Sequence, residues 1–260
     1  MSLSARPGNF GTRFHNFLYD RLALNFVYKA FTTTDIKAAI GGIRALGIRG
    51  CAISMPFKET SMESLDHVDT SAAGIESVNT IVNEQGVLTG YNTDYQAVRE
   101  LLVKSEIPVT EVFAVRGSGG MAKAVVCALR DVGFKRGFIV ARNQNTGRVL
   151  AEKYGFEWVP ELTAAVKVLV NASPIGMAGG SEANDLAFSP REISEAELVF
   201  EVVAIPMETP MVKLARSLGT KRIITGFEVI TLQALEQFVL YTGVRPPKAL
   251  VQEAAEFARA

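Results

Sequence analysis

The 260-residue chain contains few cysteines, no excess of charge of either sign and no long apolar run. Its two cysteines, Cys51 and Cys127, are too few for a disulfide framework or a cysteine-rich metal site, and the apolar stretches around them are typical of reduced core residues. Lysine plus arginine and aspartate plus glutamate both number 27, so no net field attracts nucleic acid or an anionic membrane. No stretch approaches the roughly 18–20 apolar residues that span a bilayer. The N-terminus lacks the basic segment followed by an apolar segment that is typical of a signal peptide, so we expect none. These absences favour a cytoplasmic globular protein that binds neither nucleic acid nor membrane, and we expect no metal site.

The composition is that of an ordinary globular protein, 48% hydrophobic and 21% charged, with enough chain for one large or two modest domains. Helical and strand periodicities alternate along the chain, which predicts an α/β fold with much parallel sheet. In the first third we expect helices over Thr12–Leu24 and Asp35–Leu46, and strands over Val27–Phe31, Ile48–Ile53, Ser77–Val82 and Val87–Tyr91. Further on we expect strands over Glu111–Val115, Gly137–Arg142, Val168–Asn171, Leu198–Val203 and Arg222–Thr225, and helices over Gly120–Val132 and Asn145–Tyr154. Thr209-Pro210 is expected to start a helix, and two more helices are expected after Gly226.

A glycine-rich loop, Gly117-Ser118-Gly119-Gly120-Met121-Ala122, stands between a predicted strand and a predicted helix. In that context a G-x-G-x-x-A sequence indicates a dinucleotide site. The first glycine permits the tight turn, the second lets the backbone approach a pyrophosphate, and the small Ala122 lets helix and strand pack closely. The phosphates would lie at the positive end of the helix. The alternative is a strand-to-helix turn that binds nothing.

Arg142 ends the next predicted strand, where an NAD enzyme usually carries an aspartate or glutamate. A guanidinium can bind the 2′-phosphate of NADP with two charge-assisted hydrogen bonds. The sequence therefore predicts NADP rather than NAD as the cofactor, the alternative being an ordinary solvated arginine at a strand end.

Three short segments precede the glycine-rich loop: Ser54-Met55-Pro56-Phe57-Lys58-Glu59, Ser77-Val78-Asn79-Thr80 and Gly90-Tyr91-Asn92-Thr93-Asp94. In this order they resemble the Pro-Phe-Lys, Val-Asn-Thr and Gly-x-Asn-Thr-Asp segments of the shikimate dehydrogenase family. The resemblance covers nearly the whole chain and continues through Ala141-Arg142-Asn143, Asn171-Ala172-Ser173-Pro174-Ile175-Gly176-Met177, Thr209-Pro210 and Gln233-Ala234.

The resemblance implies an N-terminal α/β substrate domain, a Rossmann-type dinucleotide-binding domain and C-terminal helices that return to the first domain. We place the substrate-binding and catalytic domain at residues 1–95 and 227–260, and the NADP-binding domain at residues 96–226. The chain begins at what would be the end of the first strand in this family.

The same resemblance implies a catalytic pair at Lys58 and Asp94, in which a lysine beside a carboxylate holds a substrate hydroxyl and shuttles its proton. Asn79 and Gln233 match residues that bind substrate hydroxyls, and Ser54 replaces a threonine of that role. Cofactor contacts are expected at Gly117, Ser118, Gly119, Gly120, Met121, Ala122, Arg142, Asn171, Ser173 and Gly226.

Each of these side chains also has a structural interpretation. Lys58 could be a solvated loop lysine, and Thr93-x-x-Gln96 reads as a capping box in which Asp94 favours a helix N-terminus. Asn79 could tie a strand end, and Gln233 could lie on an exposed helix face. For His15 on the first helix we favour packing.

The chain departs from the family where its members bind the carboxylate of shikimate. Asn9 and Gly11 stand in place of a Ser-x-Ser pair, Thr12 in place of a proline, and Ala204 in place of a tyrosine. The asparagine two residues before Ser54 is replaced by Ala52. Asn9 keeps an amide donor, so we retain it as a substrate-binding residue. The machinery for proton transfer is expected to be intact, and the carboxylate to be held weakly.

The sequence therefore predicts an NADP-dependent oxidoreductase of the shikimate pathway, of a shikimate dehydrogenase-like subclass, that interconverts a secondary alcohol and a ketone on shikimate or a related cyclic polyol acid. One alternative is a non-catalytic NADP-binding sensor; another is a methylene-tetrahydrofolate-type dehydrogenase. Apart from small molecules we expect no partner, and the protein is expected to be a monomer or a homodimer.

Overall fold

The computed structural model describes residues 1–5 and 8–260 and divides into two compact units. The first unit comprises Met1–Thr93 and Thr231–Ala260, and the second comprises Asp94–Ile230. Within the described part of the chain, no helix has the length and apolar character that a membrane crossing requires.

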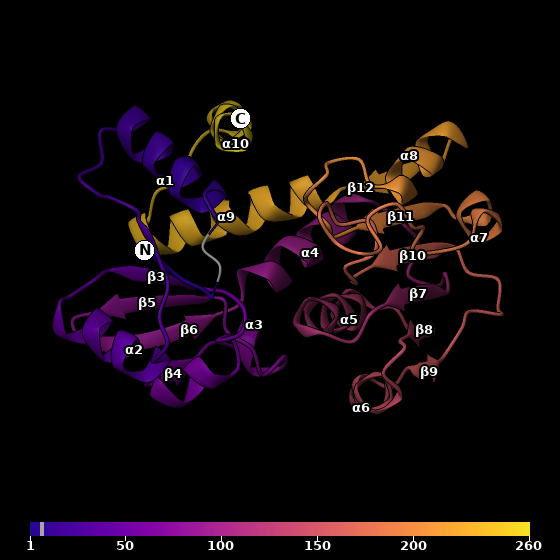
Figure 1. The fold of residues 1–260 in the computed structure, drawn as a ribbon, viewed down its shortest axis with the longest axis horizontal. Coiled ribbons are helices and arrows are strands. Elements are labelled where there is room, and N and C mark those ends of the chain that lie inside the picture. Colours follow the sequence, from indigo (N-terminus) through magenta and orange to yellow (C-terminus); the bar gives the residue numbers. More distant parts are fainter. Residues whose placement is uncertain (6–7) are drawn as a thin grey trace. The chain divides into compact units, whose positions relative to one another are not determined.

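The first unit is built on a six-stranded mixed sheet with strand order β2-β1-β3-β5-β6-β4, of which Figure 1 labels β3, β4, β5 and β6. β5 is antiparallel to both of its neighbours, and the other pairs are parallel. The hairpin β5–β6 turns at Gln85-Gly86, and both residues have a positive φ. The strands are β1 (Ser2–Leu3), β2 (Ala30–Phe31), β3 (Gly50–Ile53), β4 (His67–Val68), β5 (Thr80–Glu84) and β6 (Val87–Tyr91).

The helices of the first unit cover an apolar core that includes Ile40, Ile53 and Ile81. Asp35 caps the second helix by accepting a hydrogen bond from the N–H of Ala38 at 2.9 Å. The helices are α1 (Phe10–Arg21), α2 (Ile36–Ala45), the 3-10 turn η1 (Thr60–Ser64), α3 (Thr70–Ala73), most of α9 (Gly226–Thr242) and α10 (Lys248–Arg259).

Two predicted elements at the start of the chain are wrong in extent. The first helix begins at Phe10 and ends at Arg21, so it contains Gly11. The expected strand Val27–Phe31 is reduced to its last two residues, because the Asn16 side chain takes the place of a strand partner: its amide donates to Tyr28 O (2.9 Å) and its carbonyl accepts from Tyr28 N (2.7 Å).

The second unit contains a six-stranded, wholly parallel sheet with strand order β12-β11-β10-β7-β8-β9. Counted from β7, this is the order 3-2-1-4-5-6 of the doubly wound dinucleotide-binding fold, so the predicted Rossmann-type architecture is confirmed. The strands are β7 (Phe113–Arg116), β8 (Gly137–Val140), β9 (Glu157–Val159), β10 (Val168–Asn171), β11 (Leu198–Glu201) and β12 (Arg222–Ile224).

Helices lie on both faces of this sheet, with α5 and α6 on one side and α7 and α8 on the other (Figure 1). Ile193, Met211 and Ala215 of α7 and α8 pack on the buried side chains of the strands. The helices are α4 (Thr93–Lys104), α5 (Gly120–Val132), α6 (Gln144–Tyr154), α7 (Pro190–Glu195) and α8 (Pro210–Ser217).

Trp158, the one tryptophan of the chain, lies in the edge strand β9. Its indole N–H donates to the carbonyl of Ala141 at 3.1 Å, and the Arg148 guanidinium lies 5.0 Å from its ring. The tryptophan is thereby joined to the segment that leads directly into Arg142.

Candidate functional site

The glycine-rich loop of the second unit has the geometry that a pyrophosphate site requires. Gly117 has a φ of +119°, and a Cβ there would approach the Ala172 carbonyl to 2.6 Å, so only glycine fits. Gly119 and Gly120 begin α5, and no atom lies within 4 Å of where their Cβ atoms would be. The side-chain positions of these two glycines at the start of α5 are therefore open, and Ala122 is fully buried. These residues fit a bound dinucleotide.

The adjoining helix start belongs to the same site region. Ser118 and Thr146 are hydrogen-bonded through their hydroxyls at 2.7 Å, which ties the glycine-rich loop to the first turn of α6. Asn143 caps α6 by accepting from Thr146 N at 3.1 Å. Arg142 directly precedes this cap and forms a two-pronged ion pair with Glu182, Nη1 to Oε1 at 3.0 Å and Nη2 to Oε2 at 3.1 Å.

A buried polar cluster lies at the carboxyl ends of β10 and β11. Asn171 is fully buried, donates to the Glu201 carboxylate at 2.9 and 3.2 Å, and accepts from Ser173 N and Oγ at 3.1 and 2.7 Å. Glu201 also accepts from Thr209 Oγ1 at 2.8 Å and Val203 N at 2.9 Å. Burial, only partly offset by these hydrogen bonds, raises the pKa of Glu201 to about 7.

This cluster fixes the loops around two further predicted cofactor residues. Ser173 is held by Asn171 and accepts from Ile175 N at 3.3 Å. Gly226 is buried at the start of α9, where any Cβ would collide with the Val203 carbonyl. Met121 lies half-buried in the first turn of α5.

In the first unit, Asn79 is the centre of a second buried polar cluster. Its Oδ1 accepts from Thr93 N and Thr80 Oγ1, both at 2.8 Å, and its Nδ2 donates to Thr93 Oγ1 at 3.0 Å. Gln237 of α9 donates to Thr80 Oγ1 at 3.0 Å. Asn79 thus ties the start of β5 to the end of the segment that leads into Asp94.

The segment with Ser54 and Lys58 is bound to this cluster through the backbone. Ile53 N donates to Asn79 O at 2.7 Å, and Val78 N donates to Lys58 O at 2.9 Å. Ser54 is exposed and Lys58 half-buried. The structure therefore brings together Ser54, Lys58 and Asn79, which lie up to 25 positions apart in sequence, from Ser54 to Asn79.

Asp94 and Gln233 are close in sequence to residues of the Asn79 cluster, Asp94 to Thr93 and Gln233 to Gln237. Asp94 directly follows Thr93 as the second residue of α4, and it is the first residue of the second unit. Gln233 is half-buried on α9, one turn before Gln237 and therefore on the same helix face.

The residues that stand in place of the family's carboxylate-binding side chains are small or, in the case of Asn9, form no capping hydrogen bond. Asn9 is exposed at the N-cap of α1 and its side chain makes no capping hydrogen bond. Gly11 lies inside α1, outside the left-handed region, and a Cβ there would be 3.4 Å from the Tyr28 hydroxyl. Ala204 is half-buried in the loop after β11, in the second unit.

His15 is a packing residue, as expected. Its ring is fully buried and stacks on Tyr28 with 4.4 Å between centroids. Burial first, and then the nearby amino terminus, lower its pKa to about 3 against a smaller opposing effect of Gln237. The imidazole is therefore neutral at physiological pH.

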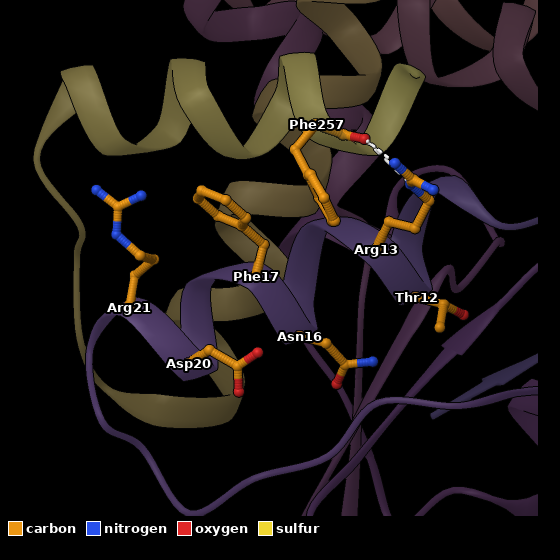
Figure 2. Close-up of a pocket in the computed structure, with 7 residues that line it drawn as sticks. All are labelled: Thr12, Arg13, Asn16, Phe17, Asp20, Arg21 and Phe257. Atoms are coloured by element: carbon orange, nitrogen blue, oxygen red, sulfur yellow. Dashed lines mark hydrogen bonds between the residues drawn. The ribbon is translucent and has the colours of Figure 1, made fainter.

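A hollow of about 440 Å³ lies between α1 and α10 within the first unit. Figure 2 shows the Arg13 guanidinium reaching the Phe257 carbonyl, to which it donates at 2.6 and 3.0 Å. Phe17 and Phe257 pack with ring centroids 5.0 Å apart. Of the residues that the structure describes, the lining includes none of the predicted site residues, so the hollow is not the candidate site.

Sequence reasoning missed Glu182, Glu201 and Gln237. Glu201 stands inside an apolar predicted strand, and a carboxylate in such a run is a usable signal of a buried polar cluster. Glu182 and Gln237 carry no local signal, because their partners lie 40 and 157 positions away.

Comparison with protein-family models matches residues 10–81 to the shikimate dehydrogenase substrate binding domain. The matched segment includes Ser54, Lys58 and Asn79.

Known proteins resemble the chain over nearly its whole length. A shikimate dehydrogenase-like protein of Haemophilus influenzae is 55% identical over 260 residues, which is 100% of this chain and 96% of the relative. A shikimate dehydrogenase (NADP(+)) of Archaeoglobus fulgidus is 34% identical, covering 93% of this chain and 91% of the relative. Among solved structures, shikimate 5-dehydrogenase of Thermus thermophilus in complex with NADP(H) and shikimate has a TM-score of 0.87 at 28% identity, covering 99% of this chain and 98% of that one.

Proposed function

Since the chain belongs to the shikimate dehydrogenase family, we propose that it is an NADP-dependent oxidoreductase that interconverts a secondary alcohol and a ketone on shikimate or a related cyclic polyol acid. The observation that carries the proposal is that backbone hydrogen bonds join the segment with Ser54 and Lys58 to the segment with Asn79, in a chain whose second unit has a dinucleotide loop on a doubly wound sheet.

The division of labour follows the two units. In the proposal the substrate-binding and catalytic domain comprises residues 1–95 and 227–260, which extends the first unit by residues 94–95 and 227–230, and the cofactor domain comprises residues 96–226. The N–H groups at the start of α5 bind the pyrophosphate, and Arg142 binds the 2′-phosphate. NADP supplies the hydride acceptor at the nicotinamide ring. Ser173 and Gly226 shape the loops beside it, and Asn171, fully buried, acts by fixing Ser173.

Lys58 and Asp94 handle the proton. Oxidation of a secondary alcohol requires the hydroxyl proton to leave as the C–H hydrogen departs with its electron pair. An ammonium of Lys58 donates a hydrogen bond to the carbonyl oxygen in the reductive direction, and its amine accepts the hydroxyl proton in the oxidative one. The carboxylate of Asp94 holds the lysine side chain and stabilises its charge. Ser54, Asn79 and Gln233 orient the remaining hydroxyls, which sets the reacting carbon in place.

The carboxylate of the substrate is the point at which this chain differs from ordinary family members. A serine pair and a tyrosine are replaced by Asn9, Gly11 and Ala204. A ligand carboxylate that loses hydrogen-bond donors is bound more weakly, since desolvation is no longer offset. We therefore propose that shikimate is a poor substrate and that a cyclic polyol acid with a different or modified acid group is preferred.

The test is a dehydrogenase assay of the full chain with shikimate, quinate and their aminated analogues, each with NADP and with NAD. The expected result is nicotinamide reduction with NADP on at least one of them, slowed roughly 10²–10⁴-fold in Lys58→Ala. Tight NADP binding without turnover on any polyol acid would favour the sensor alternative instead.

A further inference from the structure

Two arginines stand at the carboxyl ends of adjacent strands in the second unit. Arg116 is the last residue of β7 and pairs in register with Val140, which ends β8 just before the segment Ala141-Arg142. Both arginines therefore stand at the carboxyl ends of strands, where the glycine-rich loop departs. Only Arg142 has a role in the proposed function.

Arg116 is half-buried, with its guanidinium 5.0 Å from the Phe188 ring. Its Nε is buried and, within the described residues, has no hydrogen-bond partner. Burial lowers its pKa, and the charges of Glu192, Arg142 and Glu182 act on it as well. Arg116 is thus a positive charge close to the Arg142–Glu182 pair.

Glu182 occupies the fork of Arg142 with both carboxylate oxygens, at 3.0 and 3.1 Å. Its backbone is fixed in the loop after β10, where its carbonyl accepts from Gly176 N at 2.9 Å and from Asp185 N at 3.1 Å. A carboxylate that meets a guanidinium with two parallel hydrogen bonds makes the same contact as a phosphate would. The Arg142 side chain is 72% exposed, so the pair contributes little to stability and is readily exchanged.

We propose that the Glu182 carboxylate competes with the 2′-phosphate of the adenosine ribose for Arg142, and that this competition limits the preference for NADP over NAD. The inference rests on the proposed function, in which Arg142 binds this phosphate. A ligand with a 2′-phosphate must displace the Glu182 carboxylate from Arg142 and then lie near its negative charge. A ligand without the phosphate leaves the pair intact. Arg116 adds a second positive charge that favours the phosphate.

The proposal predicts a gain of affinity on removing one charge. Glu182→Gln should bind NADP roughly threefold to tenfold more tightly, because the competing charge is gone, with NAD binding within about twofold of the unmodified chain. The same gain is expected for adenosine 2′,5′-bisphosphate and not for ADP. These ligands need no turnover, so the binding result stands whether or not a substrate is found.

Glu195→Gln is the matched control. Glu195 makes an exposed ion pair with Arg191 in the same unit. Its backbone carbonyl accepts a hydrogen bond from Lys167, which directly precedes β10, so Glu195 lies near the amino ends of the strands, opposite the end that carries Arg142. This variant has the same change of charge and should leave all four affinities unchanged. A double variant, Glu182→Gln with Arg142→Gln, should lose the gain, because Glu182 acts through Arg142.

Calorimetric titrations of the full-length chain and its variants decide between the outcomes. A selective gain for 2′-phosphorylated ligands supports the proposal. Unchanged or weaker NADP binding in Glu182→Gln would overturn it and assign the pair to positioning Arg142; equal gains for NAD and NADP would also overturn it. NADP binding that follows the prediction without any dehydrogenase activity would remove the proposed function and leave the competitor role standing.

Discussion

Both units organise their predicted site around a buried asparagine, but the two clusters differ in charge. Around the Asn79 side chain the partners among the described residues are neutral: the hydroxyls of Thr80 and Thr93 and the backbone N–H of Thr93. Around Asn171 the main partner is the carboxyl of Glu201, whose pKa burial raises to about 7. The first unit therefore holds its candidate substrate residues by a cluster that pH does not change. The second holds its loops by a cluster that ionises near neutrality.

The two clusters lie beside residues with different proposed roles, the Asn79 cluster beside those for catalysis and the Asn171–Glu201 cluster beside those for cofactor binding. The side chains proposed to act on the substrate lie beside a neutral cluster, whereas the loops proposed to hold the cofactor lie beside a carboxyl buried at the strand ends. Changes to the proposed proton-transfer and substrate residues should consequently alter turnover, and changes to the proposed cofactor residues or to Glu201 should alter cofactor affinity and the response to pH.

The largest expected effect is on turnover. Lys58→Ala should lower kcat by roughly 10²–10⁴, the usual scale of general acid–base assistance. NADP affinity should stay the same, because neither Lys58 nor Asp94 is one of the proposed cofactor residues. Steady-state kinetics and a binding titration on the same variant measure both. Asp94→Asn should behave alike, and undiminished kcat in either variant would make the pair structural.

A gain in activity on shikimate is expected when the family's carboxylate-binding side chains are restored. Asn9→Ser with Gly11→Ser and Ala204→Tyr should raise kcat/KM for shikimate about a hundredfold, since two recovered hydrogen bonds to a charged group amount to about 3 kcal/mol. Gly11 lies within α1 and has room for a Cβ, so the backbone tolerates serine there. The rise should come mainly through KM. If the unmodified chain already oxidises shikimate as efficiently as typical family enzymes, other residues bind the shikimate carboxylate.

The ionisable cluster predicts a pH-dependent stability. Between the ordinary pKa of 4.5 and the folded value of about 7, the unfolded chain has released the Glu201 proton and the folded chain retains it. The folded state then binds more protons, so stability falls as pH rises through this window, by roughly 3 kcal/mol in total. His15 acts in the opposite sense, because its folded pKa is lowered and stability falls as pH drops below about 6.5.

Glu201→Gln isolates the first of these effects. Urea denaturation of the two proteins between about pH 5 and pH 8 should give curves whose difference follows the Glu201 window, since His15 contributes equally to both. Parallel curves would show that Glu201 is ionised throughout.

The smallest effect is on cofactor preference. Arg142→Asp should weaken NADP binding about tenfold or more, since a charge-assisted hydrogen bond contributes roughly 1.5–3 kcal/mol, and should leave kcat at saturating cofactor nearly unchanged. This is the converse of the Lys58 variant. Equal affinity of the unmodified chain for NAD and NADP would contradict the assignment of Arg142.

Local patterns predicted the regular elements of the second unit well. The expected bounds of α5 and β10 coincide with those in the structure, because a long amphipathic helix and a continuous apolar run are strong signals. β9 was not predicted, since Glu157–Val159 is too short for a periodicity. α7 was also missed, although Ser189 and Glu192 form a capping box that the sequence displays.

The polar clusters lie beyond such patterns. The buried role of Asn171 depends on Glu201, 30 positions away, and that of Thr80 depends on Gln237, 157 positions away. Only the fold brings these partners together. Lys58, Asn79 and Asp94 could be named beforehand through the family resemblance, and their residue types alone do not distinguish catalysis from capping or strand-end contacts.

The position of Trp158 makes the chain its own spectroscopic probe. With no other tryptophan in the sequence, near-ultraviolet excitation reports almost exclusively on the edge of the second unit. The indole is hydrogen-bonded to Ala141, directly beside Arg142, and is half-buried, so its emission should respond to a dinucleotide bound at that strand end and to local opening of β9. Events confined to the first unit should leave the signal unaltered, which would let titrations of each unit be followed separately in the unlabelled protein.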